Sequence, residues 1–255
     1  NALAVVDVRT ARVTAIKPLG FKNHNQIGMG MDVSDEDGGT NTNSGSPLIK
    51  IGPVPVKGMY LPDAIASFQT KGKTWLITAN EGDARADWPG FNEETRVRAH
   101  CNLGLDPTVF TDAANQILDS NLGRLRITTT PNGNVTGKNA QGQCTELYSF
   151  GARSVSIWTA SGQRVWDSGD QFEQRTQALA NVPFTASHDK AALDSRSASK
   201  GPGPEGVVVG RFGSRSFAFI GLERVGGVMV YDVTVPSAPT ARTRTSSISS
   251  MSVSG

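Results

Sequence analysis

Cysteine and histidine are scarce in this sequence and its net charge is small, and each of these features argues against a class of protein. The 255 residues include two cysteines and three histidines, whereas a structural zinc site normally takes four such ligands at tight spacing. The net charge of +2 is too small to indicate a nucleic-acid partner. No apolar run approaches the ~18 residues that a membrane-spanning helix needs, so we expect no membrane span.

Catalytic sequence motifs are missing as well. The chain contains no Gly-x-Ser-x-Gly, His-Glu-x-x-His, phosphate-cradling Gly-Lys-Ser/Thr or dinucleotide-binding pattern. Serine hydrolases, zinc proteases, P-loop enzymes and Rossmann enzymes are therefore poorly supported. His24, His100 and His188 are isolated in the sequence, and we interpret each as a surface or turn residue rather than a ligand.

The two cysteines favour a disulfide. Cys101 and Cys144 are more simply explained by one bond formed in an oxidising compartment than by two unrelated thiols. We expect this bond to tie a helical insertion to the start of the strand that follows. The chain also opens abruptly on a strand-like run at 2–8, which we interpret as a partial chain.

Glycine and proline are abundant and separate many short apolar runs. The 28 glycines and 13 prolines produce the pattern of short strands joined by turns. This predicts an all-β fold. Helical insertions are expected at 111–122 and 168–180, where Ser168 and Gln171 have the spacing of a capping box. Polar, glycine-rich loops are expected at 35–46 and 131–142.

A gapless internal repeat is the strongest positive signal. The segment PDAI at 62–65 matches PEGV at 204–207, and KTW at 73–75 matches RSF at 215–217. Asp63 thereby aligns with Glu205, and Glu81 aligns with Glu223, every pair being 142 residues apart. A fixed offset of this kind is the signature of a repeat architecture.

Three further β-rich runs, at 2–8, 154–158 and 227–233, resemble one another. They fit the third strands of three blades, so the fold prediction is a β-propeller, or part of one, with helical and loop insertions. Its blades would occupy 1–239, followed by an atypical or disordered tail at 240–255. The alternative is a β-sandwich, whose Greek-key order does not predict a gapless repeat.

The repeat brings acidic residues to candidate metal positions. Strand one of a propeller blade lines the central channel, so Asp63, Glu81, Glu205 and Glu223 are expected to converge near one channel mouth. Like charges this close repel one another unless a cation neutralises them, and oxygen ligands suit calcium. Asp83, in the turn at 80–85, could add a ligand. The alternative is that these acids close turns or pair with arginines.

A second acidic segment, at 32–39, ends in two glycines. Asp32, Asp35 and Asp37 give it the composition of a calcium loop, although it lacks the alternate-position spacing and terminal glutamate of the helix-loop-helix site. We therefore keep two interpretations, an ion-binding loop and a flexible surface loop.

Six motifs in order resemble the choice-of-anchor I domain family. They are MYLPDAIAS at 59–67, TANEGDAR at 78–85, ELYSFGAR at 146–153, DSGDQFE at 167–173, KGPGPEG at 200–206 and GLERVGG at 221–227. The resemblance covers roughly residues 1–239. It implies a secreted or surface bacterial propeller with an extracellular, periplasmic or cell-surface location. Related animal proteins carry the label mesenchyme-specific cell-surface glycoprotein.

The resemblance also implies an activity, because many members are labelled alkaline phosphatase by similarity to calcium-dependent propeller phosphatases. It would make Glu81 and Glu205 catalytic, with Arg85 and Arg224 as phosphate clamps. Calcium is the expected cofactor, with a second divalent or iron ion as an addition. We slightly favour a phosphoesterase acting on a phosphate ester. The alternative is a non-catalytic, calcium-stabilised adhesion module that binds a surface glycan or protein.

Overall fold

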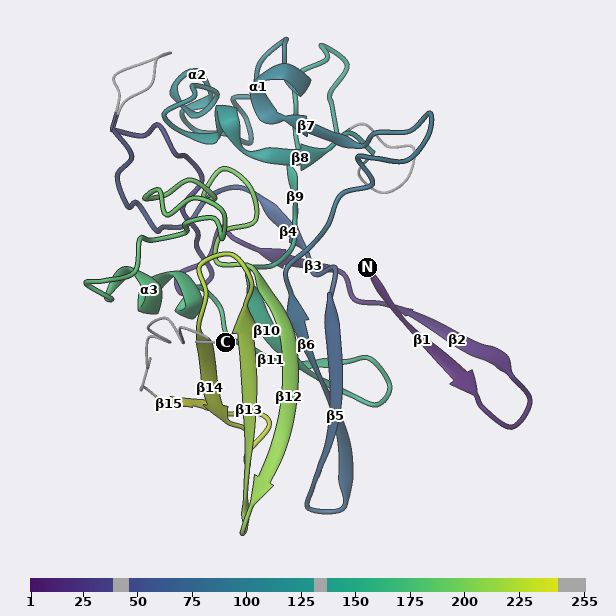
Figure 1. Ribbon diagram of the computed structural model, residues 1–255. Coiled ribbons are helices and arrows are strands. Elements are labelled where there is room, and N and C mark those ends of the chain that lie inside the picture. The colour runs from purple at the N-terminus through teal and green to yellow at the C-terminus, as the bar shows by residue number, and fades with distance from the viewer. Residues whose placement is uncertain (39–45, 131–136, 243–255) are drawn as a thin grey trace.

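Strands dominate the structure, a computed structural model that describes residues 1–38, 46–130 and 137–242. The strands form one two-stranded, two four-stranded and one five-stranded sheet in these residues, with only short helices between them (Figure 1). The all-β prediction is therefore confirmed. No helix within the described ranges is long and apolar enough to cross a membrane.

Two four-stranded antiparallel sheets lie side by side. The first sheet contains β5 (Ala64–Thr70), β6 (Lys73–Asn80), β10 (Ser154–Thr159) and β11 (Arg164–Asp167). The second contains β12 (Pro204–Phe212), β13 (Arg215–Leu222), β14 (Val228–Asp232) and β15 (Thr240–Arg242). In both, each strand pairs with the next strand of the same sheet in chain order, although residues 81–153 leave the first sheet between β6 and β10. The β12 strand contacts β5 and β6.

The internal repeat extends to the pairing register. Ile65 of β5 faces Thr78 of β6, and Val207 of β12 faces Ile220 of β13. The second pair is the first pair displaced by 142 residues in both strands. This confirms that Asp63 and Glu205 stand at equivalent positions, because a slip of one residue would have put them on opposite faces.

The main hydrophobic core lies between these two sheets. Side chains alternate across a strand, and β13 accordingly buries Ser216, Ala218, Ile220 and Leu222 on one face. Ile77 and Val155 of the first sheet and Tyr231 of the second complete the contact. Burial of these apolar surfaces holds the two repeat units together.

The five-stranded sheet is built from short strands. Its members are β3 (Phe21–Asn23), β4 (Lys57–Met59), β9 (Tyr148–Phe150), β8 (Arg126–Thr128) and β7 (Glu94–Arg96), in that order across the sheet. The strands β4 and β9 are parallel and the other pairs are antiparallel. Beside the sheet lie the one-turn helix α1 (Val97–His100) and the 3₁₀ helix η1 (Leu122–Arg124).

The predicted disulfide is present in this region. Cys101 and Cys144 are bonded, with their Cα atoms 5.6 Å apart, and both are fully buried. Leu122, Leu125 and Ile127 belong to the same hydrophobic cluster. The bond therefore joins the residue after α1 to the segment leading into β9, so the helix that it ties down is α1 and not the predicted insertion at 111–122.

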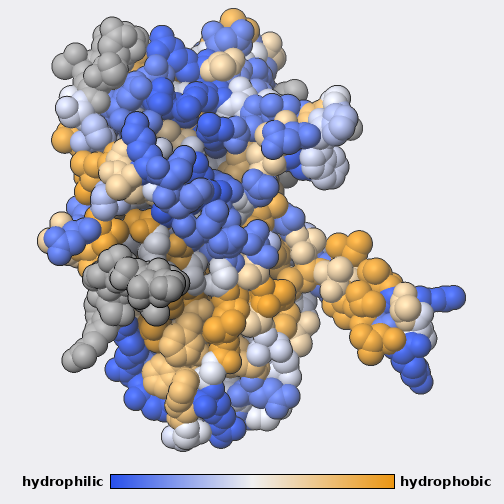
Figure 2. All heavy atoms as spheres, viewed as in Figure 1, coloured by the Kyte–Doolittle hydropathy of each residue, from blue (hydrophilic) through white to orange (hydrophobic). Residues whose placement is uncertain are grey.

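The strand-like run predicted at 2–8 begins an antiparallel hairpin of β1 (Ala2–Asp7) and β2 (Arg12–Pro18). The hairpin extends away from the body of the protein (Figure 1). Val5, Val13 and Ile16 expose apolar surface there, and Figure 2 shows hydrophobic side chains covering much of it.

Both predicted helices are shorter than expected. Instead of 111–122, α2 spans Ala113–Gln116, and the Asp112 carboxylate binds the Asn115 side chain rather than capping the helix. Instead of 168–180, α3 spans Gln171–Gln177. The Ser168 hydroxyl accepts the Val155 N–H, so it serves β10 and not the helix start.

Several predictions fall at the limits of the described chain. Residues 240–242 form β15, so the second sheet extends past the predicted boundary at 239. The rest of the predicted tail, 243–255, lies outside the described residues. So do 39–45 and 131–136, in the two predicted loops.

Candidate metal centre

Three acidic residues of the repeat meet at one end of the two sheets. Asp63 directly precedes β5 and Glu81 directly follows β6, and an antiparallel pair brings these positions to the same end. Glu205 lies at the start of β12, which packs beside β5. One oxygen from each carboxylate lies within 4.8 Å of the others. Ligands about 2.4 Å from one calcium ion are separated by this distance or less.

This trio is the single group of three or more His, Cys, Asp or Glu side chains within that distance in the described ranges. Glu81 is buried, with 4% of its surface exposed, whereas Glu205 is half-buried and Asp63 is exposed. The cluster is therefore open to solvent on one side and enclosed on the other.

The electrostatics of the trio disfavour full ionisation. Burial, followed by the Glu81 charge, raises the pKa of Asp63 above its usual value. Burial, followed by the charges of Glu223 and Asp63, raises the pKa of Glu205. Each carboxylate thus destabilises the negative charge of its neighbours, which is the condition under which a bound cation is stabilising.

A lysine that the sequence reasoning missed lies against the trio. The Lys200 ammonium is 2.8 Å from a Glu81 carboxylate oxygen and 3.4 Å from one of Asp83. The Asp83 side chain is 84% exposed and stands outside the trio. Lys200 begins a Gly-Pro-Gly-Pro segment, and positive φ angles at Gly201 and Gly203 let this segment turn back toward β6. In the sequence, the only indication of this contact is a charged residue directly before a glycine- and proline-rich turn.

Glu223 and Arg224, the other two candidate site residues of the second repeat unit, form an ion pair with each other. The Arg224 guanidinium lies 2.7 Å from a Glu223 oxygen, and it also hydrogen-bonds the exposed His188 ring at 2.8 Å. Glu223 acts on the trio through its charge but is not a member of it. The Arg224 charge offsets part of the rise in the pKa of Glu205.

Arg85 is engaged elsewhere. Its Nε and Nη2 atoms form a bidentate ion pair with Glu93 at 3.0 and 2.9 Å, which lowers the Glu93 pKa to about 2. The guanidinium also lies over the Phe91 ring at 4.8 Å and the Trp88 ring at 5.9 Å. The two N–H groups that could bind a phosphate side by side are therefore already bonded to Glu93.

The three acids of the segment 32–39 have separate partners. Asp32 accepts backbone N–H groups of Ser34 and Lys50, and Asp35 forms a bidentate ion pair with Arg124. Asp37 accepts the Leu48 N–H and lies 3.5 Å from the Lys50 ammonium. The structure therefore does not bring Asp32, Asp35 and Asp37 together as one group.

Asp194, which has no recognisable sequence motif, is electrostatically coupled to Asp32. Burial, then the Asp32 charge, raises the Asp194 pKa to about 8. Burial also raises the Asp32 pKa to about 7. One Asp194 oxygen accepts the Thr185 and Ser197 hydroxyls, and its other oxygen is buried without a hydrogen bond.

Other buried ionic groups stabilise the centre of the chain. The Lys22 ammonium donates to the carbonyls of Ala152 and Gly169 and lies 3.6 Å from Asp167. Arg153 and Glu173 form a buried ion pair at 2.8 Å. His24 is fully buried and bonds the Met29 carbonyl, so it is not a surface residue, although it does lie in the bend that follows β3.

Comparisons with known proteins agree with the sequence motifs. The chain is 32% identical over 120 residues to Gigasin-3a of Magallana gigas, covering 44% of this chain and 40% of that protein. It is 27% identical over 250 residues to the mesenchyme-specific cell surface glycoprotein of Strongylocentrotus purpuratus, covering 86% of this chain and 30% of that protein. The chain therefore spans less than half the length of these relatives. No solved structure matches it significantly.

The choice-of-anchor I domain model matches residues 1–236, nearly the whole described chain. The match includes both repeat units and all three acids of the candidate metal centre. This chain belongs to the choice-of-anchor I domain family.

Proposed function

We propose that this chain is a secreted or cell-surface module that binds calcium at Asp63, Glu81 and Glu205. The observation that carries the proposal is the convergence of three carboxylates, from two repeat units in equal register, to within 4.8 Å of one another. Hard oxygen ligands and partial exposure to water suit calcium, which completes its coordination with water molecules.

The surface location is supported by the family and by one relative. A protein named as a cell surface glycoprotein aligns with 86% of this chain. The buried Cys101–Cys144 disulfide fits an oxidising compartment, since such bonds are rare in the cytosol. We therefore place the module outside the cytoplasm.

We further propose that the sheets are blades of a β-propeller. The β12 strand packs beside β5 and β6, as inner strands of neighbouring blades do, and the two sheets share one strand order and one register. The β1–β2 hairpin would supply the two outer strands of a third blade. In this arrangement the trio stands at the mouth of the central channel.

Calcium titration tests the binding site. We expect calorimetry to show saturable binding, and we expect calcium to raise the unfolding temperature relative to a chelator. A ligand at a hundredfold excess over its Kd adds about 2.7 kcal/mol of stability.

Glu81→Gln and Glu205→Gln should each weaken binding by about tenfold or more, because each removes a charged ligand. Glu94→Gln, in the five-stranded sheet, is the matched control and should bind normally. Absence of saturable binding by the wild-type chain would refute the proposal.

A phosphoesterase remains a second candidate function. The specific observation in its favour is that Lys200 and Arg224 lie beside the acids, where they could bind the oxygens of a phosphate ester. Glu81 and Glu205 would then hold the ion that polarises the ester. Arg85 is less suited to this role, because its guanidinium already forms a bidentate ion pair with Glu93.

Hydrolysis of a chromogenic phosphate monoester and diester, with calcium and with chelator, tests this second function. Activity that requires calcium and is lost in both Arg224→Gln and Glu205→Gln would support it. If the chain binds calcium but hydrolyses neither substrate, the non-catalytic module is the better description.

A further inference from the structure

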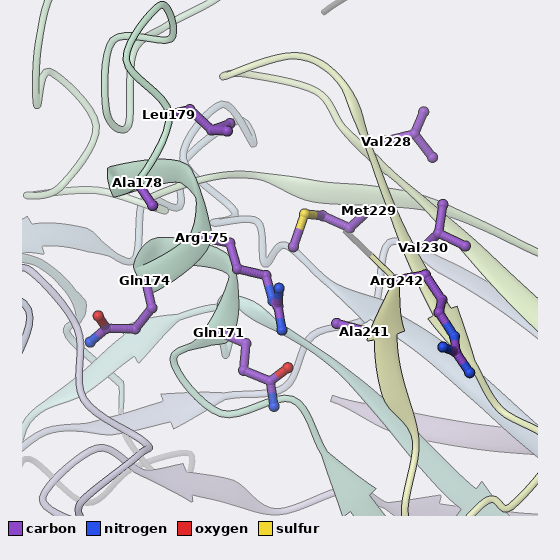
Figure 3. A pocket seen from close by; sticks show the side chains of 10 residues that line it. All are labelled: Gln171, Gln174, Arg175, Ala178, Leu179, Val228, Met229, Val230, Ala241 and Arg242. Carbon is purple, nitrogen blue, oxygen red and sulfur yellow. The ribbon is translucent and has the colours of Figure 1, made fainter. Parts of the chain in front are cut away.

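A groove between α3 and the strands β14 and β15 belongs to none of the sites described above. Its volume is about 340 Å³, within the range of pockets that hold small organic molecules. Ten residues line it: Gln171, Gln174, Arg175, Ala178, Leu179, Val228, Met229, Val230, Ala241 and Arg242. Figure 3 shows Gln171 and Arg175 extending from the helix toward the strands, and Met229 extending from β14 toward the helix.

The floor and walls of the groove are apolar. Leu179 and Ala178 contribute from the end of α3, and Val228, Met229 and Val230 contribute from β14. Met229 is buried, whereas 42% of Val228 is exposed, so the apolar surface continues from the core to the opening of the groove. A ligand with a hydrocarbon body would remove this surface from water, which is favourable in proportion to the area covered.

The polar groups of the groove are mainly hydrogen-bond donors. Arg175 and Arg242 each carry five N–H groups, and a guanidinium accepts no hydrogen bond. Arg175 already hydrogen-bonds the Tyr231 side chain, which uses only part of its donor capacity. Gln171 uses its carbonyl oxygen to accept the Tyr231 hydroxyl at 3.2 Å, so its amide NH₂ group is the end left for a ligand. Among the described residues that line the groove there is no aspartate or glutamate. The groove therefore complements an anionic head group rich in acceptors.

Arg242 is the more adaptable of the two arginines. Half of its side chain is exposed, and one of its nitrogens lies 3.2 Å from Asp232. The same Asp232 oxygen accepts two N–H groups of Arg215, which does not line the groove. Asp232 thus keeps a strong partner when Arg242 turns toward a ligand.

From this combination we infer that the groove between α3 and β14–β15 binds a medium-chain organic carboxylate, with its hydrocarbon on the Met229 side and its carboxylate on Arg242 and Arg175. A carboxylate accepts two parallel N–H bonds from one guanidinium, which fixes the position of the head group. The site is separate from the calcium trio, so either can fail in experiment without the other.

Calorimetric titration with decanoate, kept below its micelle concentration, tests this inference. We expect saturable binding with one site per chain, and binding of the uncharged analogue decanol weakened about tenfold or more through loss of the charge-assisted bonds. Arg242→Gln should weaken decanoate binding by a similar factor. Val228→Trp, which places an indole at the opening, should block it.

Arg215→Gln is the matched control, because it removes the other partner of Asp232 without altering the groove. It should bind decanoate as the wild type does. No saturable decanoate binding, equal affinity for decanol, or equal weakening by Arg215→Gln and Arg242→Gln would each overturn the inference. Circular dichroism of every variant shows whether the fold is retained. If Arg242→Gln loses decanoate binding because it unfolds, the folded Val228→Trp variant decides whether the groove is the binding site.

Discussion

Replacing the buried Asp194 with asparagine should stabilise the chain at alkaline pH. Asp194 is fully buried, and one of its oxygens accepts hydroxyls from Thr185 and Ser197. Burial and the neighbouring Asp32 raise its pKa from 3.8 to about 8. Asparagine keeps the same shape and the same accepting oxygen, so the substitution removes the charge with little change in packing.

The sign of the effect follows from proton linkage. Because the pKa of Asp194 is higher in the folded state, the folded chain holds a proton that the unfolded chain has released between pH of about 4 and 8. Folding stability therefore falls as the pH rises through this window. The slope reaches at most about 1.4 kcal/mol per pH unit for each proton, and four units set a ceiling of about 6 kcal/mol.

Two neighbouring groups shape the observed curve. Asp32, with a pKa raised to about 7, titrates in the same range and is coupled to Asp194, so the two acids share the loss of stability. His24 acts with the opposite sign: its folded pKa lies well below 6.5, so its contribution changes only at acidic pH. Measurements between pH of about 6.5 and 8 therefore avoid His24. The N-terminal ammonium of Asn1, whose pKa burial lowers from 8.0, also titrates in this range, and its effect cancels when the wild type is compared with Asp194→Asn.

Urea unfolding at several pH values in this range provides the assay. The wild-type free energy of unfolding should fall by about 1–2 kcal/mol across the range. Asp194→Asn should show a clearly smaller slope and should be more stable than the wild type at the alkaline end. Asp112→Asn, at an exposed position, is the control. Parallel curves for the wild type and Asp194→Asn would refute the reasoning.

Two further predictions concern the framework of the fold. Replacing Cys101 and Cys144 with serine opens a loop of 43 residues and should cost about 4 kcal/mol by chain entropy, measured by urea unfolding, and an unchanged midpoint would contradict this. Gly82→Ala should lower the unfolding temperature strongly, because Gly82 has φ 85° and an added Cβ would lie 2.0 Å from a backbone nitrogen. The same substitution at Gly72, which has open space around it, should cost much less.

The repeat could be predicted because it depends on residues that are close together in the sequence. Alternating apolar residues, a turn and a closing acid recur at 62–81 and 204–223, and strand pairing between neighbours follows from short connections. Such patterns determine both register and face. This is why Asp63, Glu81 and Glu205 could be expected together before any distance was known.

The buried ionic groups could not be predicted in the same way. Lys22 is fully buried because backbone carbonyls from residues 130 and 147 positions away surround its ammonium. Asp194 lies in a segment without regular structure, and its environment includes Asp32, far away in sequence. Burial of a charge depends on such long-range packing, and no local spacing reports it.

The count of charges around the trio supports the proposed divalent ion. Five acids interact with one another in this region: Asp63, Glu81, Asp83, Glu205 and Glu223. Three bases accompany them: Lys200, Arg196 and Arg224. The difference of five and three is a net charge of −2 when all are ionised. Burial and this excess of negative charge raise the pKa values of Asp63 and Glu205, so a bound proton or cation would offset part of the repulsion. Since protons and calcium compete for the same oxygens, acidification should weaken calcium binding.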